Sequence, residues 1–361
     1  MTVAIIVGTR PEIIKMAPVI RQLEERKTDF FILHTGQHYS YGLDRVFFEQ
    51  LRLPRAKYNL EVGSGSHAEQ TAKILTGVEK VLLKENPDIV LVEGDTNSVL
   101  AGALAAVKLH IKVGHVEAGL RSYDINMPEE INRRLTDHCS DYLFAPTEKA
   151  RAILRGEGIT EDKIFITGNT IVDAVYQNIK FARKQGNALS ALHLTPKEYF
   201  LVTLHRQENV DNRARFTSII DGLNKVAASF NLPIVYPIHP RSRKMMSGFD
   251  LTPGKIMLVD PLDFLGFLQV ESNARLIFTD SGGVQEEACI LNVPCVTLRD
   301  NTERPETIDV GANILAGASP EKILQCAELM LGRRKNRWQN PFGDGKAGER
   351  IVKLITEGRI E

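Results

Sequence analysis

The chain lacks the features that mark membrane-spanning, secreted and generally nucleic-acid-binding proteins. No apolar run in its 361 residues approaches the roughly 20 residues needed to span a bilayer. Lysine plus arginine and aspartate plus glutamate both number 45, and this zero net charge argues against a general affinity for nucleic acid or anionic membrane. The N-terminus runs directly into a strand pattern without a secretion signal, so we expect a cytoplasmic protein.

Cysteine is scarce, and the familiar metal and nucleotide motifs are missing. The four cysteines show no C-x-x-C spacing and lie in apolar or helical patterns, which is typical of reduced core thiols (Cys139, Cys289, Cys295 and Cys326). The sequence contains no P-loop, the glycine turn at residues 281–283 is not G-x-G-x-x-G, and no D-x-D follows the strand that ends near residue 94. We therefore expect no metal site.

The chain does have short apolar runs that alternate with amphipathic stretches, a pattern typical of parallel sheets covered by helices on both faces. In the first half, strands are predicted at residues 2–8, 30–36, 88–94, 112–118, 141–146 and 164–168. In the second half they are predicted at residues 199–204, 233–239, 256–261, 275–281 and 294–299. This predicts an α/β protein with two Rossmann-like, doubly wound domains, at 1–170 and 171–345. A last helix, at about 346–361, is expected to pack on one of them.

The first strand-to-helix corner, GTRPEIIK, places Arg10 and Lys15 near the start of a helix. Cations are disfavoured there by the helix dipole unless an anion binds beside them. Solvated charges are the alternative. The pattern favours an oxyanion or phosphate site.

Acidic residues follow the later strands of the first half. Asp95 follows a glycine at a strand end, Glu117 ends the next strand, and Glu129 begins a helix. Singly each has an ordinary explanation: a helix cap for Asp95, an ion pair with Arg121 for Glu117, and a dipole complement for Glu129. Ligands bind at the carboxyl ends of parallel strands, so the three are also expected to converge. Crowded carboxylates raise one another's pKa, which lets one hold a proton while another acts as a base.

The second half carries its unusual residues at strand ends as well. His205 and Arg206 follow one strand and are candidates for binding a phosphate. The amides of a serine and two glycines open a helix after another strand and favour a phosphate site (Ser281, Gly282 and Gly283). Glu287 lies one turn further on, where a carboxylate suits a ribose diol. Arg304 lies in the charged loop after the next strand.

These motifs occur together in one known family. GTRPEIIKMAP, GDTNSVLAGALAA, GHVEAGLRS, MPEEINR, ITGNTIVDA, LHRQEN, DSGGVQEEA and RDNTERPE resemble, in order, the non-hydrolysing UDP-N-acetylglucosamine 2-epimerases, closest to archaeal members. The resemblance implies a glycosyltransferase-B type fold, in which two Rossmann-like domains face a central cleft. It implies reversible conversion of UDP-GlcNAc to UDP-ManNAc for glycan synthesis, through elimination of UDP to 2-acetamidoglucal and re-addition, with no cofactor.

Roles are implied by the same resemblance. Acid–base work falls to Asp95, Glu117 and Glu129, and His205 assists departure of the diphosphate. UDP is held by seven residues (Arg10, Lys15, Ser281, Gly282, Gly283, Glu287 and Arg304). A second, activating substrate site would use Gln70, Arg206 and His239, although the HTGQHYSYGLD segment departs from the bacterial loop. A homodimer is expected. The alternatives are a hydrolysing 2-epimerase, a glycosyltransferase of the same fold and a UDP-sugar sensor without activity.

Overall fold

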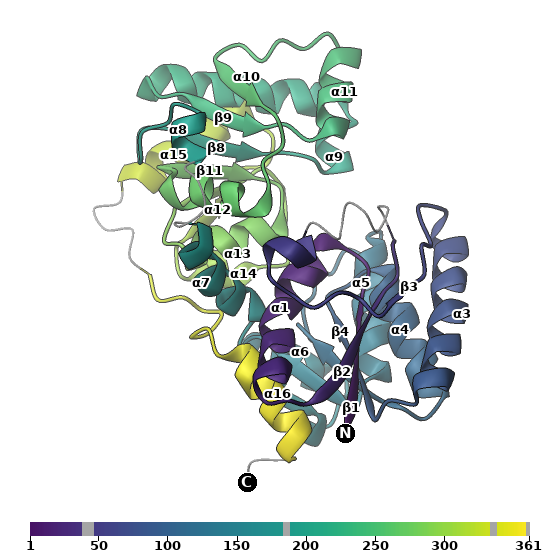
Figure 1. Cartoon of the computed structure of the whole chain (residues 1–361). Coiled ribbons are helices and arrows are strands. Elements are labelled where there is room, and N and C mark those ends of the chain that lie inside the picture. The colour runs from purple at the N-terminus through teal and green to yellow at the C-terminus, as the bar shows by residue number, and fades with distance from the viewer. Residues whose placement is uncertain (38–46, 183–187, 333–337, 359–361) are drawn as a thin grey trace. The chain divides into compact units, whose positions relative to one another are not determined.

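The computed structural model describes residues 1–37, 47–182, 188–332 and 338–358. Within them the chain forms two compact units, Met1–Ala174 with Phe342–Glu361, and Val175–Pro341 (Figure 1). The domain bounds expected from the sequence, 1–170 and 171–345, differ from these units by a few residues at each junction.

The first unit is built on a parallel sheet whose described strands lie in the order β3-β2-β1-β4-β5-β6-β7. The strands are β1 Thr2–Val7, β2 Asp29–His34, β3 Tyr58–Asn59, β4 Ile89–Glu93, β5 Lys112–Val116, β6 Tyr142–Ala145 and β7 Ile164–Ile166. The helices are α1 Arg10–Glu25, α3 His67–Glu85, α4 Asn97–Lys108, α5 Pro128–Cys139, α6 Glu148–Gly156, η1 Glu161–Lys163 and α16 Ala347–Glu357. Helix α7, Thr170–Ala182, continues into the second unit.

The order of these strands follows from their apolar runs. In β1, Val3 to Val7 are all buried, because the strand lies between β2 and β4 and is covered on both faces. Helices α3 and α4 pack side by side and cover one apolar layer with small and branched residues. Strands β1, β4 and β5 are therefore neighbours, and their carboxyl ends lie at one edge of the sheet.

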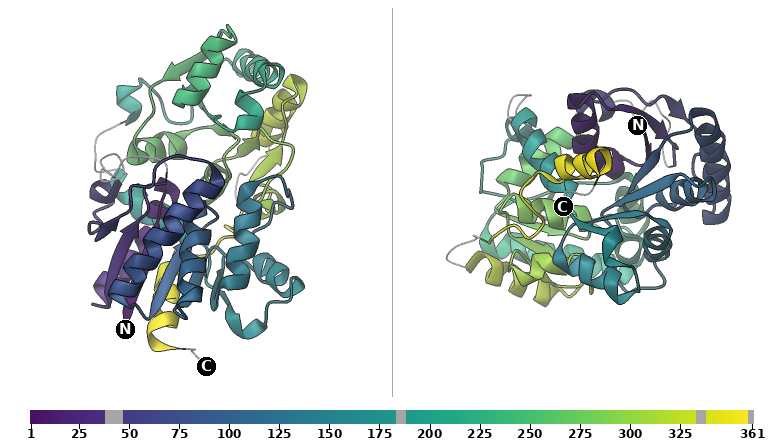
Figure 2. Two further views of the ribbon diagram at one scale, coloured as in Figure 1. Left: turned by 90° about the vertical axis from the view of Figure 1, so that its right-hand side faces the viewer. Right: turned by 90° about the horizontal axis from the view of Figure 1, so that it is seen from below.

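The C-terminal helix belongs to the first unit. Helix α16 packs against α1 (Figure 2), and a Cβ added to Gly348 would lie 2.9 Å from the carbonyl carbon of Pro18. Asp173 accepts hydrogen bonds from the amides of Ala347 at 3.1 Å and Gly348 at 3.0 Å. Burial raises the pKa of Asp173 to about 6, against the opposing effect of these amides.

The second unit repeats the architecture with a parallel sheet of order β10-β9-β8-β11-β12-β13 in the described residues. Its strands are β8 Phe200–Thr203, β9 Ile234–Pro237, β10 Ile256–Val259, β11 Leu276–Thr279, β12 Cys295–Thr297 and β13 Asn313–Leu315. Its helices are α8 Ala188–Ala191, α9 Gln207–Val210, α10 Arg213–Phe230, α11 Pro240–Gly248, α12 Phe264–Asn273, α13 Gly282–Ile290, α14 Pro305–Asp309 and α15 Pro320–Gly332.

Each predicted strand is present, and two further strands were missed. Strands β3 and β13 have two and three residues. Both lie at the edge of a sheet, where a strand needs no long apolar run. The cysteines are free thiols, and Cys289, Cys295 and Cys326 are buried, whereas Cys139 is half-buried.

Candidate active site

The carboxyl edge of the first sheet gathers acidic side chains from neighbouring strands. Glu93 is the last residue of β4, Asp95 follows it by two residues, and Glu117 comes directly after β5. Glu117 has a φ of +70°, a left-handed conformation that costs a non-glycine residue on the order of 1–3 kcal/mol. Such strain persists where the surrounding structure fixes a side chain for use, which marks Glu117 as a candidate functional residue.

Lys15 lies between two of these glutamates. Its ammonium is 3.2 Å from Oε1 of Glu93 and also forms a short ion pair with Glu117. All three side chains are almost wholly buried. The sequence predicted that Lys15 would face a bound diphosphate, and an ion pair with Arg121 was the alternative to a functional role for Glu117. In the structure the partner of Glu117 is Lys15, because helix α1 brings its ammonium to the ends of β4 and β5.

Burial sets the protonation of this cluster. Loss of hydration, and then the neighbouring charge of Glu117, raises the pKa of Glu93 well above its ordinary value, although the charge of Lys15 opposes the rise. Burial likewise raises the pKa of Glu12 to about 7, against hydrogen bonds from Thr96 and Gly8. Those hydrogen bonds measure 2.6 Å from the Thr96 hydroxyl and 2.5 Å from the Gly8 amide. Two carboxyl groups here can therefore hold protons near neutral pH.

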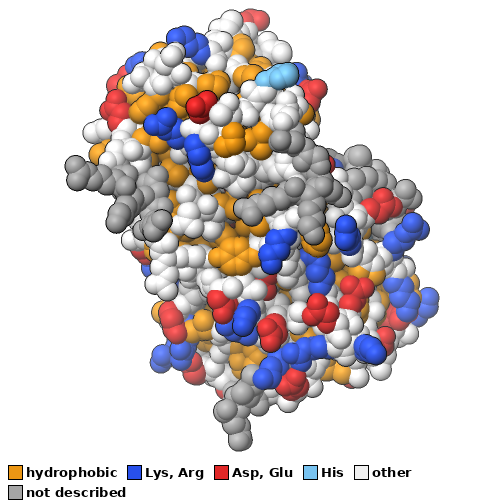
Figure 3. Space-filling view, turned by 60° about the vertical axis from the view of Figure 1, so that its left-hand side comes forward, with side chains coloured by type: hydrophobic (Ala, Val, Ile, Leu, Met, Phe, Trp, Pro, Cys, Tyr) orange, Lys and Arg blue, Asp and Glu red, His pale blue; other side chains and the backbone are white. Residues whose placement is uncertain are grey.

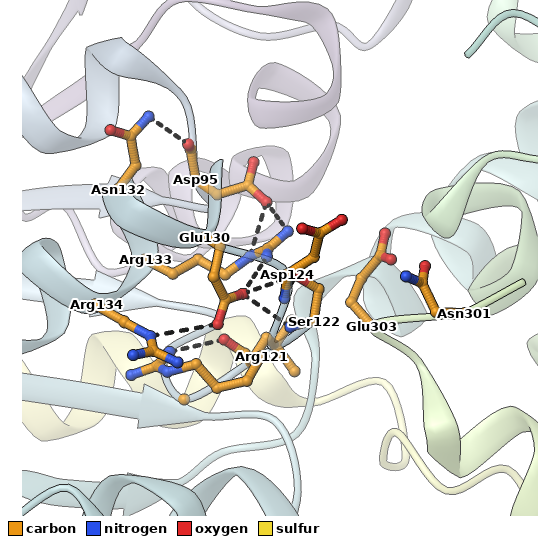
Figure 4. A network of polar contacts seen from close by, with 12 residues as sticks. Asp95, Arg121, Ser122, Asp124, Glu130, Asn132, Arg133, Arg134, Asn301 and Glu303 are labelled. Carbon is orange, nitrogen blue, oxygen red and sulfur yellow. Dashed lines mark hydrogen bonds and ion pairs between the residues drawn. The ribbon is translucent and has the colours of Figure 1, made fainter. Parts of the chain in front are cut away.

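Asp95 does not cap helix α4, and its side chain is oriented by an arginine. Its Oδ2 accepts hydrogen bonds from Arg133 of α5, at 2.6 Å from Nη2 and 3.0 Å from Nε, while Thr96 caps α4 (Figure 4). The same guanidinium donates to Glu130 at 2.9 Å. Burial opposes ionisation of Glu130, but hydrogen bonds from Ser122 and the charge of Arg133 lower its pKa below the ordinary value. Asp95 keeps 30% of its side chain exposed, so one anion of this network remains open to a ligand.

Glu129 lies beside this network in the first turn of α5, half-buried. Among the described residues, its carboxylate has no hydrogen-bond or ion-pair partner. Its neighbour Glu130 instead accepts hydrogen bonds from Ser122 and Arg133. Arg10 opens α1, and its guanidinium carbon lies 4.8 Å from the ring centre of Phe47. Arg10 and Glu129 are therefore placed at the same edge as Asp95, on the first turns of two helices.

His205 of the second unit is held by an aspartate that the sequence analysis did not single out. Nδ1 of His205 is 3.1 Å from Asp280, and the same carboxylate accepts the amides of His205 and Arg206 and the side chain of Asn209. Burial would raise the pKa of Asp280, but these hydrogen bonds and the His205 ring hold it below the ordinary value. The buried anion leaves Nε2 as the ring nitrogen that Asp280 does not engage, on a side chain that is 44% exposed. The missed signal was the aspartate at the end of β11.

The glycine turn after β11 has little room for side chains at its first glycine. Ser281 is the N-cap of α13, and Gly282 and Gly283 begin the helix. A Cβ on Gly282 would lie 2.3 Å from Oε1 of Glu303, whereas one on Gly283 would meet only the Ser281 hydroxyl, at 3.9 Å. The amides at this helix start are thus uncovered on the side of Gly283, as an anion site requires.

Arg304 and Glu287 both have acidic neighbours. Arg304 is buried and its Nε lies 2.8 Å from Glu286. Glu287 lies against Glu271, whose pKa is raised well above its ordinary value by burial and then by the charge of Glu287. Glu287 itself is half-buried.

The three residues named for an activator site have different surroundings. Gln70 is buried, and its amide donates to the carbonyl oxygens of Gln37 at 2.8 Å and Gly63 at 2.9 Å. Arg206 lies 3.5 Å from Glu303. His239 is the N-cap of α11 and accepts the Arg241 amide at 3.2 Å. Part of the HTGQHYSYGLD segment, residues 38–44, lies outside the described residues.

The outer surface carries charges of both signs, interspersed over the face in Figure 3. None of the described helices is both long and apolar enough to cross a membrane. In the described ranges, no group of three or more histidine, cysteine, aspartate and glutamate side chains is arranged to hold a metal ion.

Comparison with known proteins places the chain in a family. The model of the family described as UDP-N-acetylglucosamine 2-epimerase matches residues 21–356. The chain belongs to the UDP-N-acetylglucosamine 2-epimerase family. It is 57% identical to the UDP-N-acetylglucosamine 2-epimerase of Methanocaldococcus jannaschii, over 99% of this chain and all of the relative. It is 55% identical to that of Methanococcus maripaludis, over 98% of each.

A solved structure agrees with these relatives. The crystal structure of the Methanocaldococcus jannaschii UDP-GlcNAc 2-epimerase in complex with UDP-GlcNAc and UDP matches with a TM-score of 0.93 and 57% identity, over 99% of this chain and 100% of that one. The resemblance to archaeal, non-hydrolysing epimerases is confirmed, as is the glycosyltransferase-B type fold of two α/β units. The chain is an isomerase of this epimerase family.

Proposed function

We propose that this epimerase interconverts UDP-N-acetylglucosamine and UDP-N-acetylmannosamine. The C2–H bond breaks, its electron pair forms the C1=C2 double bond of 2-acetamidoglucal, and the C1–O bond pair leaves with UDP. UDP then adds back at C1 while a proton returns to the opposite face of C2. Protons and electrons balance over the cycle, so the reaction consumes nothing.

The roles proposed for individual residues come from the family resemblance and are supported by the local contacts of each side chain. Asp95, Glu117 and Glu129 move protons at the sugar ring, and His205 stabilises the departing diphosphate. Arg10 and the helix start at Ser281 to Gly283 bind the phosphates, with Arg304 beside them. Glu287 accepts hydrogen bonds from the ribose. Lys15 forms an ion pair with Glu117. Its positive charge balances the one negative charge that Glu117 and Glu93 carry between them.

The chemistry demands this division of work. The C2 proton is weakly acidic because no carbonyl adjoins C2, so its removal is coupled to departure of a stabilised leaving group. A general acid or base contributes roughly 10²- to 10⁴-fold, and positioning and charge stabilisation supply the rest.

One observation carries the proposal: a strained glutamate and an arginine-oriented aspartate end neighbouring strands in a buried acidic cluster. Binding a nucleotide sugar alone does not require several acids at one edge, some of which retain protons near neutral pH. A catalyst that takes a proton from carbon and returns another to carbon does.

The test incubates the protein with UDP-GlcNAc in D₂O and follows the mixture by NMR. We expect deuterium at C2 and a growing UDP-ManNAc signal, with no accumulation of free ManNAc. Free ManNAc with stoichiometric UDP would show the hydrolysing reaction instead. Substrate without deuterium or product would leave only the transferase and sensor functions.

We also propose that the nucleotide sugar activates its own conversion from a second site, and that Gln70, Arg206 and His239 each take part in this activation. Conversion of UDP-ManNAc should then begin with a lag that a trace of UDP-GlcNAc removes. Gln70→Ala should lengthen that lag. Identical progress curves with and without the trace would contradict the second site.

Finally, we propose a cytoplasmic homodimer. Ile131 and Leu135, one turn apart on α5, are 44% and 49% exposed and provide apolar surface for a second copy. Light scattering should give twice the 40.3 kDa chain mass, and Leu135→Glu should reduce it to one chain. A monomeric wild-type protein would refute the dimer.

A further inference from the structure

Glu93 is a buried acidic residue to which the reaction above gives no role. It is the last residue of β4, 1% exposed, in an otherwise apolar strand of sequence IVLVE. An ionised carboxylate in such a position is costly unless it is paired. The contacts of Glu93 with Lys15 and Glu117 explain how a carboxyl group is accommodated at this buried position.

Two carboxyl groups compete for one ammonium at this point. Lys15 lies 3.2 Å from Glu93 and in a short ion pair with Glu117, so both carboxyl groups come within reach of one Nζ atom. With both ionised, the three buried groups would carry a net negative charge. With one proton present they are neutral, which is the form that burial favours.

The proton belongs on Glu93 for a geometric reason. Lys15 is in closer contact with Glu117 than with Glu93, so Glu117 is the better stabilised anion. The other charged group acting on Glu93 is Glu12 of α1, which adds negative potential. Glu93 therefore has around it the Glu117 carboxylate, one shared cation, and the Glu12 carboxyl group, which ionises as pH rises through about 7.

We propose that Glu93 is a positioning residue for Glu117. It carries one proton, donates it in a hydrogen bond to the Glu117 carboxylate, and holds Lys15 on the other side. Glu117 is thereby ionised and fixed in its strained conformation before substrate arrives. This inference rests on the proposed role of Glu117 at the sugar ring.

The test compares two variants. Glu93→Leu removes the donor and should lower the rate of C2 deuterium exchange by roughly 10²-fold, as for a displaced catalytic group, with UDP affinity unchanged. Glu93→Gln keeps a neutral donor of the same shape and should restore the rate to within about tenfold of wild type. Circular dichroism and UDP binding verify that each variant is folded.

The pH profile separates positioning from a structural role. Because the pKa of Glu93 is raised, wild-type activity should fall on the alkaline side as that proton is lost and Glu117 and Glu93 repel. The glutamine variant cannot lose the proton, so its alkaline limb should lie at higher pH.

Three results would overturn the inference. They are full exchange in Glu93→Leu, equal loss in both variants, and an alkaline limb in Glu93→Gln that coincides with wild type. The last result can be read even if the leucine variant does not fold, and in that case loss of activity in folded Glu93→Gln also refutes the inference. Absence of exchange in the wild-type protein would refute the epimerisation itself, which keeps the two failures distinct.

Discussion

Replacing Lys15 by methionine tests whether the buried cluster is held together by its single ammonium. The side chain is 11% exposed and has glutamate oxygens on two sides, so its removal leaves buried carboxyl groups uncompensated. Removing one partner of a buried ion pair costs about 3–5 kcal/mol. We expect Lys15→Met to lower the free energy of unfolding of the first unit by that amount at neutral pH.

The loss should depend on pH with a definite sign. Glu93 keeps its proton to a higher pH in the folded chain than in the unfolded one, so folding takes up a proton. Stability therefore falls as pH rises from the ordinary glutamate pKa of 4.5 through the raised one. Without Lys15 the raised pKa moves higher still, so the difference between variant and wild type should be larger at pH 8 than at pH 5.

A matched control is available in the same unit. Lys112 pairs with Asp141 at 3.0 Å with 62% of its side chain exposed, and such surface pairs contribute roughly 0–1 kcal/mol. Urea unfolding followed by circular dichroism, together with hydrogen exchange of the β4 and β5 peptides, should separate Lys15→Met from Lys112→Met. Equal losses in the two variants, or a larger loss at pH 5, would refute the reasoning.

Three further variants test other parts of the structure. Gly8→Ala would place a Cβ 2.1 Å from a serine hydroxyl, so we expect about 1–3 kcal/mol of destabilisation in urea, against almost none for Gly156→Ala, where nothing lies within 4 Å. Asp280→Asn should cost about 1.5–3 kcal/mol by the fluorescence of the sole tryptophan, and the difference should vanish in acid, because the lowered pKa of the carboxyl loses its benefit as pH falls through it. Asp95→Asn and Glu117→Gln should each abolish C2 exchange while sparing UDP binding by calorimetry, and near-normal exchange in both would remove them from the reaction.

Most of the strands were predictable because parallel strands buried on both faces are continuous apolar runs. Strand β3 was not predicted because its two residues, Tyr58 and Asn59, are too few to show a periodic pattern. The positions of Asp95 and Glu117 at one sheet edge followed from the same pattern. The pattern of apolar runs does not show which charged side chains of different helices and strands contact one another.

Side-chain partners therefore account for most of the differences from expectation. The ion pairs of Lys15 were not predicted, because its glutamate partners lie far away in sequence, on β4 and after β5. Asp280 was not singled out in the sequence, although it holds His205 from the neighbouring strand end. The signal in both cases was a single acidic residue at the end of an apolar strand, which is an expensive place for an unpaired charge.

A crystal structure of the protein with UDP-GlcNAc would test most directly whether the acidic sheet edge acts on the sugar. We expect the carboxylates of Asp95, Glu117 or Glu129 to lie within about 3.5 Å of the reacting C2 hydrogen or its opposite face, with the diphosphate at the Ser281–Gly283 amides. A sugar ring bound away from all three carboxylates would contradict the proposed reaction.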